Sequence, residues 1–107
     1  MQNAEFWIMT KYYMRVITTK CDFSVEDQLL HSVRKLLQEI DIGDISFQRF
    51  IPYWKTEGFG ELNCQFSSDN SLEIIQSLFA THWDSNTADS RWSNIRLPHA
   101  SFLWISN

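Results

Sequence analysis

The chain contains little glycine, proline or cysteine, and it has no long apolar run. Three glycines and two prolines among 107 residues argue against long flexible linkers. Two cysteines, Cys21 and Cys64, are too few for the disulfide framework of a small secreted protein, although one bridge between them is chemically allowed. Neither a stretch of about 18 apolar residues nor a basic leader at Met1–Glu5 is present. We therefore expect one cytoplasmic domain, residues 1–107, with reduced thiols and no membrane span.

Basic residues are also scarce relative to acidic ones. Thirteen Asp and Glu against nine Lys and Arg give a formal net charge of −4. Affinity for a nucleic-acid backbone comes mainly from Lys and Arg, which release counterions from phosphates. An acidic chain instead suits a basic protein surface, because complementary charge speeds and orients the encounter. The balance argues against a nucleic-acid partner and favours a protein partner with a basic surface.

No arrangement of residues typical of an active site or a metal site is present. His31, His82 and His99 lack the close spacing of zinc ligands, and neither cysteine lies in a C-x2-C pair. Cys64 falls on the inward phase of an expected strand, where thiols are mostly inert. Gly58-Phe59-Gly60 lacks the lysine and hydroxyl partners of a phosphate-binding loop. We therefore predict no enzyme activity, no catalytic residue, no metal and no cofactor.

Two segments in the first half of the chain have clear periodicity. Phe6–Thr19 is rich in aromatic and β-branched residues and alternates as a central strand does. Ser24 and Asp27 resemble a capping box at the start of a helix, and Gly43 suits its end in a left-handed conformation. Between these positions one helical stripe of apolar residues is formed by Val25, Leu29, Leu30, Val33, Leu36, Leu37 and Ile40.

The second half adds strands and one more helix. The expected elements are strands at Ile45–Ile51 and Glu61–Ser67, a helix from Leu72 that Trp83 closes, an exposed loop over 84–90, and strand character in Trp92–Asn107. Within the strand at Glu61–Ser67, alternation predicts that Leu62, Cys64 and Phe66 face inward. The resulting order, β-α-β-β-α-β, is the ferredoxin-like arrangement. We therefore predict an α+β fold, an antiparallel sheet with two helices on one face and the other face free for a ligand, a second sheet or a partner.

The stretch Glu57–Cys64 partly resembles the RNA-recognition motif, a family with the same order of elements. That family carries Lys/Arg-Gly-aromatic-Gly/Ala-Phe-Val-x-aromatic on one strand, and the residues that fit are Gly58, Phe59, Gly60 and Leu62. Glu57 replaces the basic residue, while Glu61 and Cys64 replace the stacking aromatics. The resemblance implies the fold, but the three departures argue against RNA binding. We interpret Gly58–Gly60 as a hairpin turn that enters the third strand.

Tryptophan is abundant, with five in a chain that also has eight Phe and three Tyr. Trp54, Trp83 and Trp92 stand at the ends of expected elements, beside acidic or turn residues. Because Trp and Tyr are enriched among binding hot spots, these three are candidate anchors for a partner. The alternative is that they cap the ends of the core. Trp7 and Trp104 lie within expected strands, and we predict both in the core.

The whole-chain layout, with Glu57–Glu61, Trp83-Asp84 and Asp89–Trp92, resembles the small immunity proteins encoded beside bacterial polymorphic or contact-dependent inhibition toxins. This resemblance implies tight binding to one cognate toxin domain, often a nuclease, whose active site or substrate surface is occluded. Acidic side chains would take the positions of substrate phosphates. The predicted partner-binding residues are Trp54, Glu57, Glu61, Trp83, Asp84, Asp89 and Trp92. A ferredoxin-like regulatory or small-ligand-binding domain and a divergent RNA binder are the alternative predictions, and the oligomeric state is left open.

Overall fold

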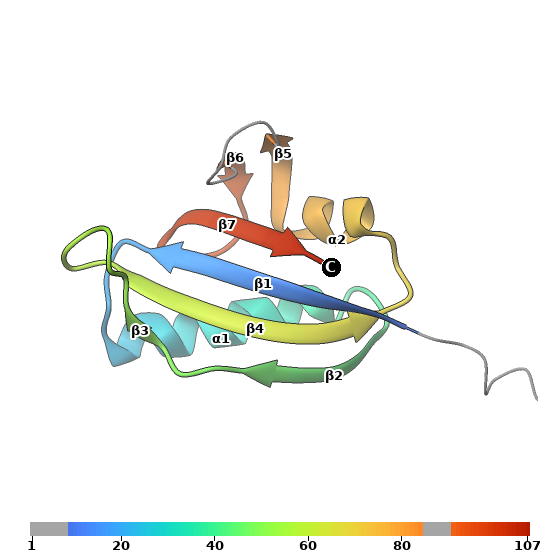
Figure 1. Cartoon of the computed structure of the whole chain (residues 1–107), viewed down its shortest axis with the longest axis horizontal. Helices are drawn as coiled ribbons and strands as arrows, with labels where there is room; N and C mark the ends of the chain where they lie inside the picture. The colour runs from blue at the N-terminus through green and yellow to red at the C-terminus, as the bar shows by residue number, and fades with distance from the viewer. Residues whose placement is uncertain (1–8, 85–90) are drawn as a thin grey trace, which may run out of the picture.

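A computed structural model describes residues 9–84 and 91–107 and has an α+β fold. The elements are β1 (Thr10–Thr18), α1 (Phe23–Leu37), β2 (Ile42–Phe47), β3 (Ile51–Pro52), β4 (Gly60–Ser68), α2 (Leu72–Phe79), β5 (Ala80–Asp84), β6 (Arg91–Ile95) and β7 (Ala100–Ser106). The main antiparallel sheet has the order β2-β4-β1-β7, and β3 pairs with the first residues of β4. Figure 1 shows β5 and β6 as a separate hairpin that rises beyond β7.

β1 and β4 lie side by side at the centre of the sheet, and their alternation decides which face is buried. Their register places Tyr12 opposite Phe66, Met14 opposite Cys64, and Val16 opposite Leu62. All six side chains are buried. Because successive strand residues point to opposite faces, the residues between them form the open face of the sheet. The prediction of Leu62, Cys64 and Phe66 as inward-facing is confirmed.

Helix α1 is confirmed, but both of its predicted ends are wrong. Asp22 is the N-cap, and its carboxylate accepts a hydrogen bond of 3.0 Å from the Val25 backbone N–H. This bond satisfies one of the free amides of the first turn, so the predicted box of Ser24 and Asp27 does not start the helix. The helix ends at Leu37 with Gln38 as its C-cap. Gly43 lies in β2 instead of in a left-handed cap.

Helix α2 is also confirmed, but the prediction that it continues to Trp83 is wrong. Ser71 caps its start by accepting a hydrogen bond of 3.3 Å from the Ile74 backbone N–H. The helix ends at Phe79 and runs directly into β5, which pairs with β6. Arg96 satisfies the last carbonyls: its backbone N–H donates to Phe79 O at 2.8 Å, and its Nη1 donates to Leu78 O at 3.1 Å.

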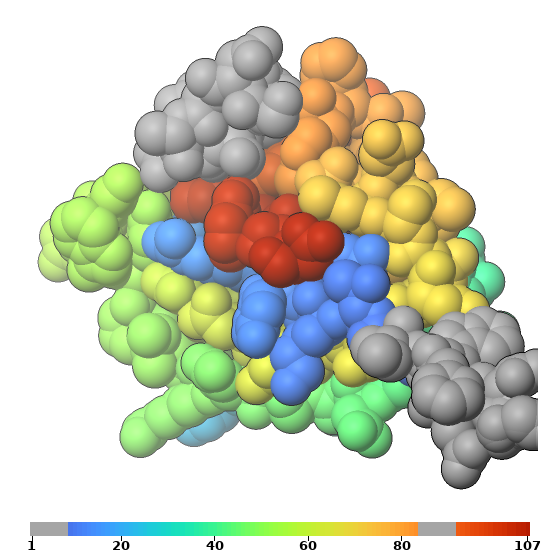
Figure 2. Space-filling view, turned by 45° about the vertical axis from the view of Figure 1, so that its right-hand side comes forward, coloured from blue at the N-terminus to red at the C-terminus, as the bar shows by residue number. Residues whose placement is uncertain are grey.

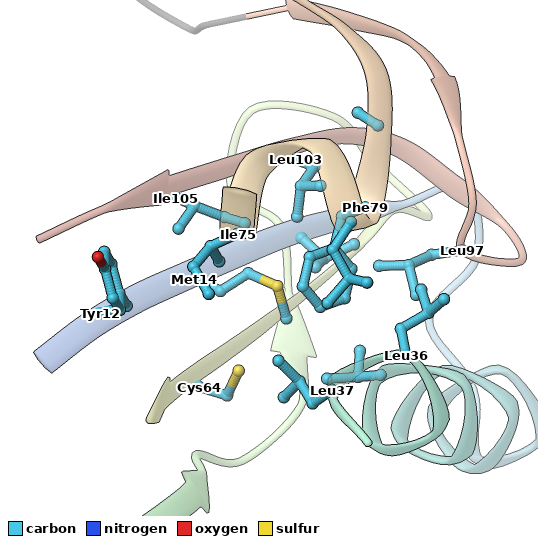
Figure 3. Close-up of a cluster of buried hydrophobic side chains, with 14 of the residues drawn as sticks. Tyr12, Met14, Leu36, Leu37, Cys64, Ile75, Phe79, Leu97, Leu103 and Ile105 are labelled. Atoms are coloured by element: carbon cyan, nitrogen blue, oxygen red, sulfur yellow. The ribbon is translucent and has the colours of Figure 1, made fainter. Parts of the chain in front are cut away.

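The core lies between one face of the sheet and both helices. Figure 3 shows side chains from every layer in a single cluster, including Leu36 and Leu37 of α1, Ile75 and Phe79 of α2, and Leu103 and Ile105 of β7. Both helices therefore pack on the same face. No helix in residues 9–84 or 91–107 has the length and apolar character needed to cross a membrane.

The predicted α+β class is confirmed, but the order of elements is not a clean β-α-β-β-α-β. The β5–β6 hairpin stands between α2 and β7, and the strand expected at Ile45–Ile51 is divided into β2 and β3. Strand β5 was predicted as the end of a helix and the start of an exposed loop, whereas the strand character predicted from Trp92 onward is confirmed in β6. Asp84 of that expected loop belongs to β5, and residues 85–90 lie outside the described residues.

Candidate functional site

The β3–β4 loop holds the first of the predicted binding residues in a hydrogen-bonded turn. The Tyr53 backbone N–H donates to Phe59 O at 2.9 Å, and the Phe59 N–H donates to Thr56 O at 3.2 Å. Gly58 has φ of 84°, a left-handed conformation that side chains disfavour. The predicted hairpin turn is therefore confirmed.

Gly60 sets how closely this loop packs on the sheet. A Cβ atom at Gly60 would lie 2.5 Å from Phe50 Cζ and 2.8 Å from Thr18 Oγ1. Such distances are well inside van der Waals contact, so the close approach requires glycine. Gly60 therefore packs closely against Thr18 at the end of β1 and against Phe50 in the segment before β3.

Trp54 projects from this loop into solvent, next to the buried residue Tyr53. The Trp54 side chain is 78% exposed, whereas Tyr53 is buried, with ring centroids 6.4 Å apart. Tyr53 also contacts the Phe102 ring edge-on at 6.0 Å, which joins the base of the loop to β7. Lys55 Nζ lies 5.2 Å from the Trp54 ring centroid, within cation–π range. Tyr53 thus fixes the loop, while the large apolar ring of Trp54 faces outward.

Other exposed apolar residues lie at the same end of the sheet. Phe23, the first residue of α1, is 84% exposed, and Ile51 of β3 is also exposed. Figure 1 shows β3, the start of α1 and the β3–β4 loop at one end of the molecule. We name the exposed residues Phe23, Ile51, Trp54 and Glu57 the loop-end surface.

A pocket of about 400 Å³ opens beside this surface. Its lining combines acidic, basic, thiol and aromatic groups from Cys21, Asp22, Phe23, Glu26, Arg49 and Phe50. Pockets that hold small ligands have volumes of roughly 300–1,000 Å³. The same end of the molecule therefore offers an exposed apolar surface, acidic side chains and a hollow.

Glu61 differs from Glu57 because its charge is compensated within the chain. Glu57 is exposed on the loop. Glu61 lies on the open face of β4, where Oε2 is 3.3 Å from Arg15 Nε and accepts a hydrogen bond of 2.9 Å from Asn63 Nδ2. Its side chain is only 14% exposed. Of the two glutamates predicted to meet a partner, Glu57 is the accessible one.

Trp83 and Trp92 form a second aromatic group, on the β5–β6 hairpin. They face each other across the strand pair with ring centroids 3.9 Å apart and an angle of 51° between the rings. Trp92 is buried, and its indole Nε1 has no hydrogen-bond partner within the described part of the chain. This supports the core-capping alternative for Trp92, while Trp83 is half-buried.

The two predicted acidic neighbours of this pair are Asp84 and Asp89. Asp84 pairs through its backbone with Arg91, and Asp89 lies outside the described residues. In Figure 2 the green β3–β4 loop and the orange β5 stand apart, with β1 and β7 between them. The structure therefore divides the predicted binding residues between two places.

The open face of the sheet carries exposed aromatics that were not predicted as binding residues. Tyr13 is 46% exposed and Trp104 is 37% exposed. Placing Trp104 in the core was wrong, because Leu103 and Ile105 point inward and strand alternation turns Trp104 outward. Trp7, also predicted in the core, lies outside the described residues. Arg15 lies opposite Trp104 on the neighbouring strand, and its guanidinium group forms an ion pair with Glu61.

The cysteines and histidines form no metal-binding group in the described residues. Within residues 9–84 and 91–107, no three His, Cys, Asp or Glu side chains are placed to hold a metal ion. Burial raises the pKa of the Cys64 thiol from 9.0 to about 12, so the thiol stays protonated at neutral pH. His99 contacts Gln28 at 3.2 Å between Nε2 and Oε1.

Comparisons of the chain with protein-family models, with curated proteins and with solved structures found no match.

Proposed function

We propose that this chain is a protein-binding module and that it acts as an immunity protein. It would bind a cognate bacterial toxin domain with a basic surface, for which a nuclease is the first candidate, and occlude the active site or substrate surface. The observation that carries this proposal is Trp54, a tryptophan 78% exposed on a turn whose neighbour Tyr53 is buried.

An exposed tryptophan in an ordered turn contributes more to binding than to folding. Its ring buries little area within the chain, so little of its hydrophobic free energy stabilises the fold. The same ring can be desolvated by a partner at low entropic cost, because the side chain has only two rotatable bonds. Trp is among the residues most enriched at binding hot spots. Phe23 and Ile51 are further exposed apolar residues, on elements that lie at the same end of the molecule.

The charges near this surface favour a basic partner. The chain has a net charge of −4, Glu57 is exposed on the turn, and Asp22 and Glu26 line the adjoining pocket. Arg49 in the same pocket is a local exception. Acidic groups around an apolar centre suit the binding of a nuclease surface that normally receives phosphates. Glu61 has no part in this proposal, since Arg15 already compensates its charge.

We also propose that the main sheet is a ferredoxin-like core with a hairpin added. The order β2-β4-β1-β7, the antiparallel pairing and the two helices on one face support this interpretation. In it, β2 and β3 together take the place of one edge strand, and β5–β6 is an insertion before the last strand. The insertion leaves the loop-end surface unaltered.

The proposal is tested by co-expressing the chain with each toxin domain encoded next to its gene and measuring bacterial growth. The wild-type chain is expected to restore growth against one domain. The double variant Trp54→Ala, Glu57→Lys is expected to lose this protection, and Tyr13→Ala, which removes another exposed aromatic ring, is expected to keep it. Full protection by the double variant would overturn the loop-end assignment, and failure of the wild-type chain against every domain would overturn the immunity function.

The pocket beside the loop-end surface supports a second candidate, a small-ligand-binding or regulatory domain. Its volume of about 400 Å³ and mixed lining suit a small polar molecule. A metabolite that binds only the folded chain raises its Tm. A thermal-shift screen with wild type and Arg49→Ala distinguishes the two functions, because a true pocket ligand loses its effect in the variant.

A further inference from the structure

The two edges of the main sheet differ in how they are protected from pairing with another strand. An edge strand has unpaired backbone N–H and C=O groups, and proteins shield such edges with charges, prolines, bulges or very short strands. The edge formed by β2 and β3 has all four devices: the charged Asp44, the proline Pro52, a register shift between Ile42 and Ile45, and a β3 of two residues.

The opposite edge, β7, has none of these devices along its regular part. Its sequence, Ala-Ser-Phe-Leu-Trp-Ile-Ser, contains no charged residue and no proline. The register shift with β1 falls between Ala100 and Phe102, which leaves Phe102–Ser106 as a regular run. In the described part of the chain, β6 and α2 contact β7, but no strand pairs with its outer side. Figure 1 shows β7 as the last strand at this side of the sheet.

We infer that β7 pairs with β7 of a second copy of this chain, so that two sheets join across a two-fold axis. When β7 of one copy pairs antiparallel with β7 of the second copy, both strands have the same sequence. A charged side chain on one strand would then lie opposite or near the same charge on the other. A strand without charge meets this requirement. Because β7 has no charged residue, electrostatics gives it no preference for a basic or an acidic strand of another protein.

The side chains of β7 also suit this pairing. Around a two-fold axis at Leu103, Phe102 of one copy lies opposite Trp104 of the other. Strand alternation places both side chains on the open face, where Phe102 also contacts Tyr53. Aromatic pairs across neighbouring strands stabilise a sheet. The exposed part of Trp104 thereby gains a partner that its own chain does not provide. This inference concerns β7 alone and does not rest on the proposed immunity function.

The oligomeric state of the full chain, measured by sedimentation equilibrium over a range of concentrations, tests the inference. The wild type is expected to dimerise, and added salt is expected to strengthen the dimer by screening the repulsion between two chains of charge −4. Trp104→Lys is expected to raise the dimer dissociation constant at least about tenfold. Ser106→Lys, a smaller change on the same strand, is expected to weaken the dimer in the same direction.

The matched control is Tyr13→Lys, which places the same charge on the same face but on the central strand β1. It is expected to leave the dimer intact. A wild type that stays monomeric up to roughly 200 µM, a weak affinity for any specific pairing, overturns the inference. Equal loss of the dimer in Tyr13→Lys and Trp104→Lys also overturns it, because that result assigns the contact to the open face instead of the β7 edge. Circular dichroism of each variant verifies that the fold is retained.

Discussion

Replacing Trp54 by alanine is expected to separate binding from folding. About a fifth of the side chain is buried, since it is 78% exposed. For a ring with roughly 250 Å² of surface, this is about 50 Å², which is worth about 1 kcal/mol at about 25 cal/mol per Å². The cation–π contact with Lys55 adds at most about 1 kcal/mol at an exposed site. The free energy of unfolding should therefore fall by only about 1–2 kcal/mol.

The same substitution should weaken binding far more. Loss of a tryptophan anchor at the centre of an interface costs about 2 kcal/mol or more, which raises Kd about 30-fold. Isothermal titration of the purified partner into wild type and Trp54→Ala measures Kd, and chemical denaturation of each chain alone measures the free energy of unfolding. Trp92→Ala provides the contrast, because Trp92 is 8% exposed and its loss should cost about 3–5 kcal/mol of stability.

Two results would refute this reasoning. An unchanged Kd for Trp54→Ala, with Tyr13→Ala as the exposed-aromatic control, would show that the loop-end surface does not contact the partner. A stability loss for Trp54→Ala as large as that for Trp92→Ala would show that Trp54 supports the fold, and its exposure would then carry no information about binding.

Further predictions concern stability and pH. Gly60→Ala places a Cβ 2.5 Å from Phe50 Cζ and 2.8 Å from Thr18 Oγ1, so overpacking should lower the free energy of unfolding by about 1–3 kcal/mol in urea denaturation; an unchanged midpoint would contradict the close packing of the loop. Gly58→Ala meets no atom within 4 Å, and its cost should be the backbone strain alone, roughly 1–2 kcal/mol. The pKa of Cys64 is raised from 9.0 to about 12, so the unfolded chain loses this proton first and stability should fall as the pH rises from about 9 toward 12. The loss should be roughly 1 kcal/mol by pH 10, and Cys64→Ala should lack this component; equal pH slopes for the two chains would show that the thiol is not buried.

The sequence predicted the elements whose periodicity is local. Alternation along Glu61–Ser67 assigned the inward face of β4 correctly, because a half-buried strand repeats every two residues. The apolar stripe that starts at Val25 likewise located α1. Asp22 was not predicted as the N-cap of α1, because Ser24 and Asp27, which follow it, can also accept hydrogen bonds from the free backbone N–H groups at a helix start.

Strand β5 could not be predicted, because its pairing with β6 decides its conformation. Leu78, Phe79, His82 and Trp83 have spacing that also suits a helix, and the pairing of β5 with β6 overrides this local preference. Trp104 was misplaced for a different reason, because tryptophan is usually buried, although alternation with Leu103 already predicted an outward side chain.

The candidate site was predicted in part. Trp54 and Glu57 were identified from their types and their position in a turn, and both are exposed. Phe23 was missed, since an apolar residue before an amphipathic helix is expected to pack against it. The ion pair between Arg15 and Glu61 could not be predicted from the sequence, because the two residues are distant in the chain and come together only when β1 and β4 pair.

Hydrogen–deuterium exchange of the chain, alone and saturated with its partner, is the most direct test of whether the loop-end surface contacts the partner. Binding slows exchange where the partner excludes water and stabilises backbone hydrogen bonds. We expect the largest added protection in residues 53–59 and at the start of α1, around Trp54 and Phe23. Protection concentrated in the β5–β6 hairpin, with unchanged exchange in residues 53–59, would contradict this expectation.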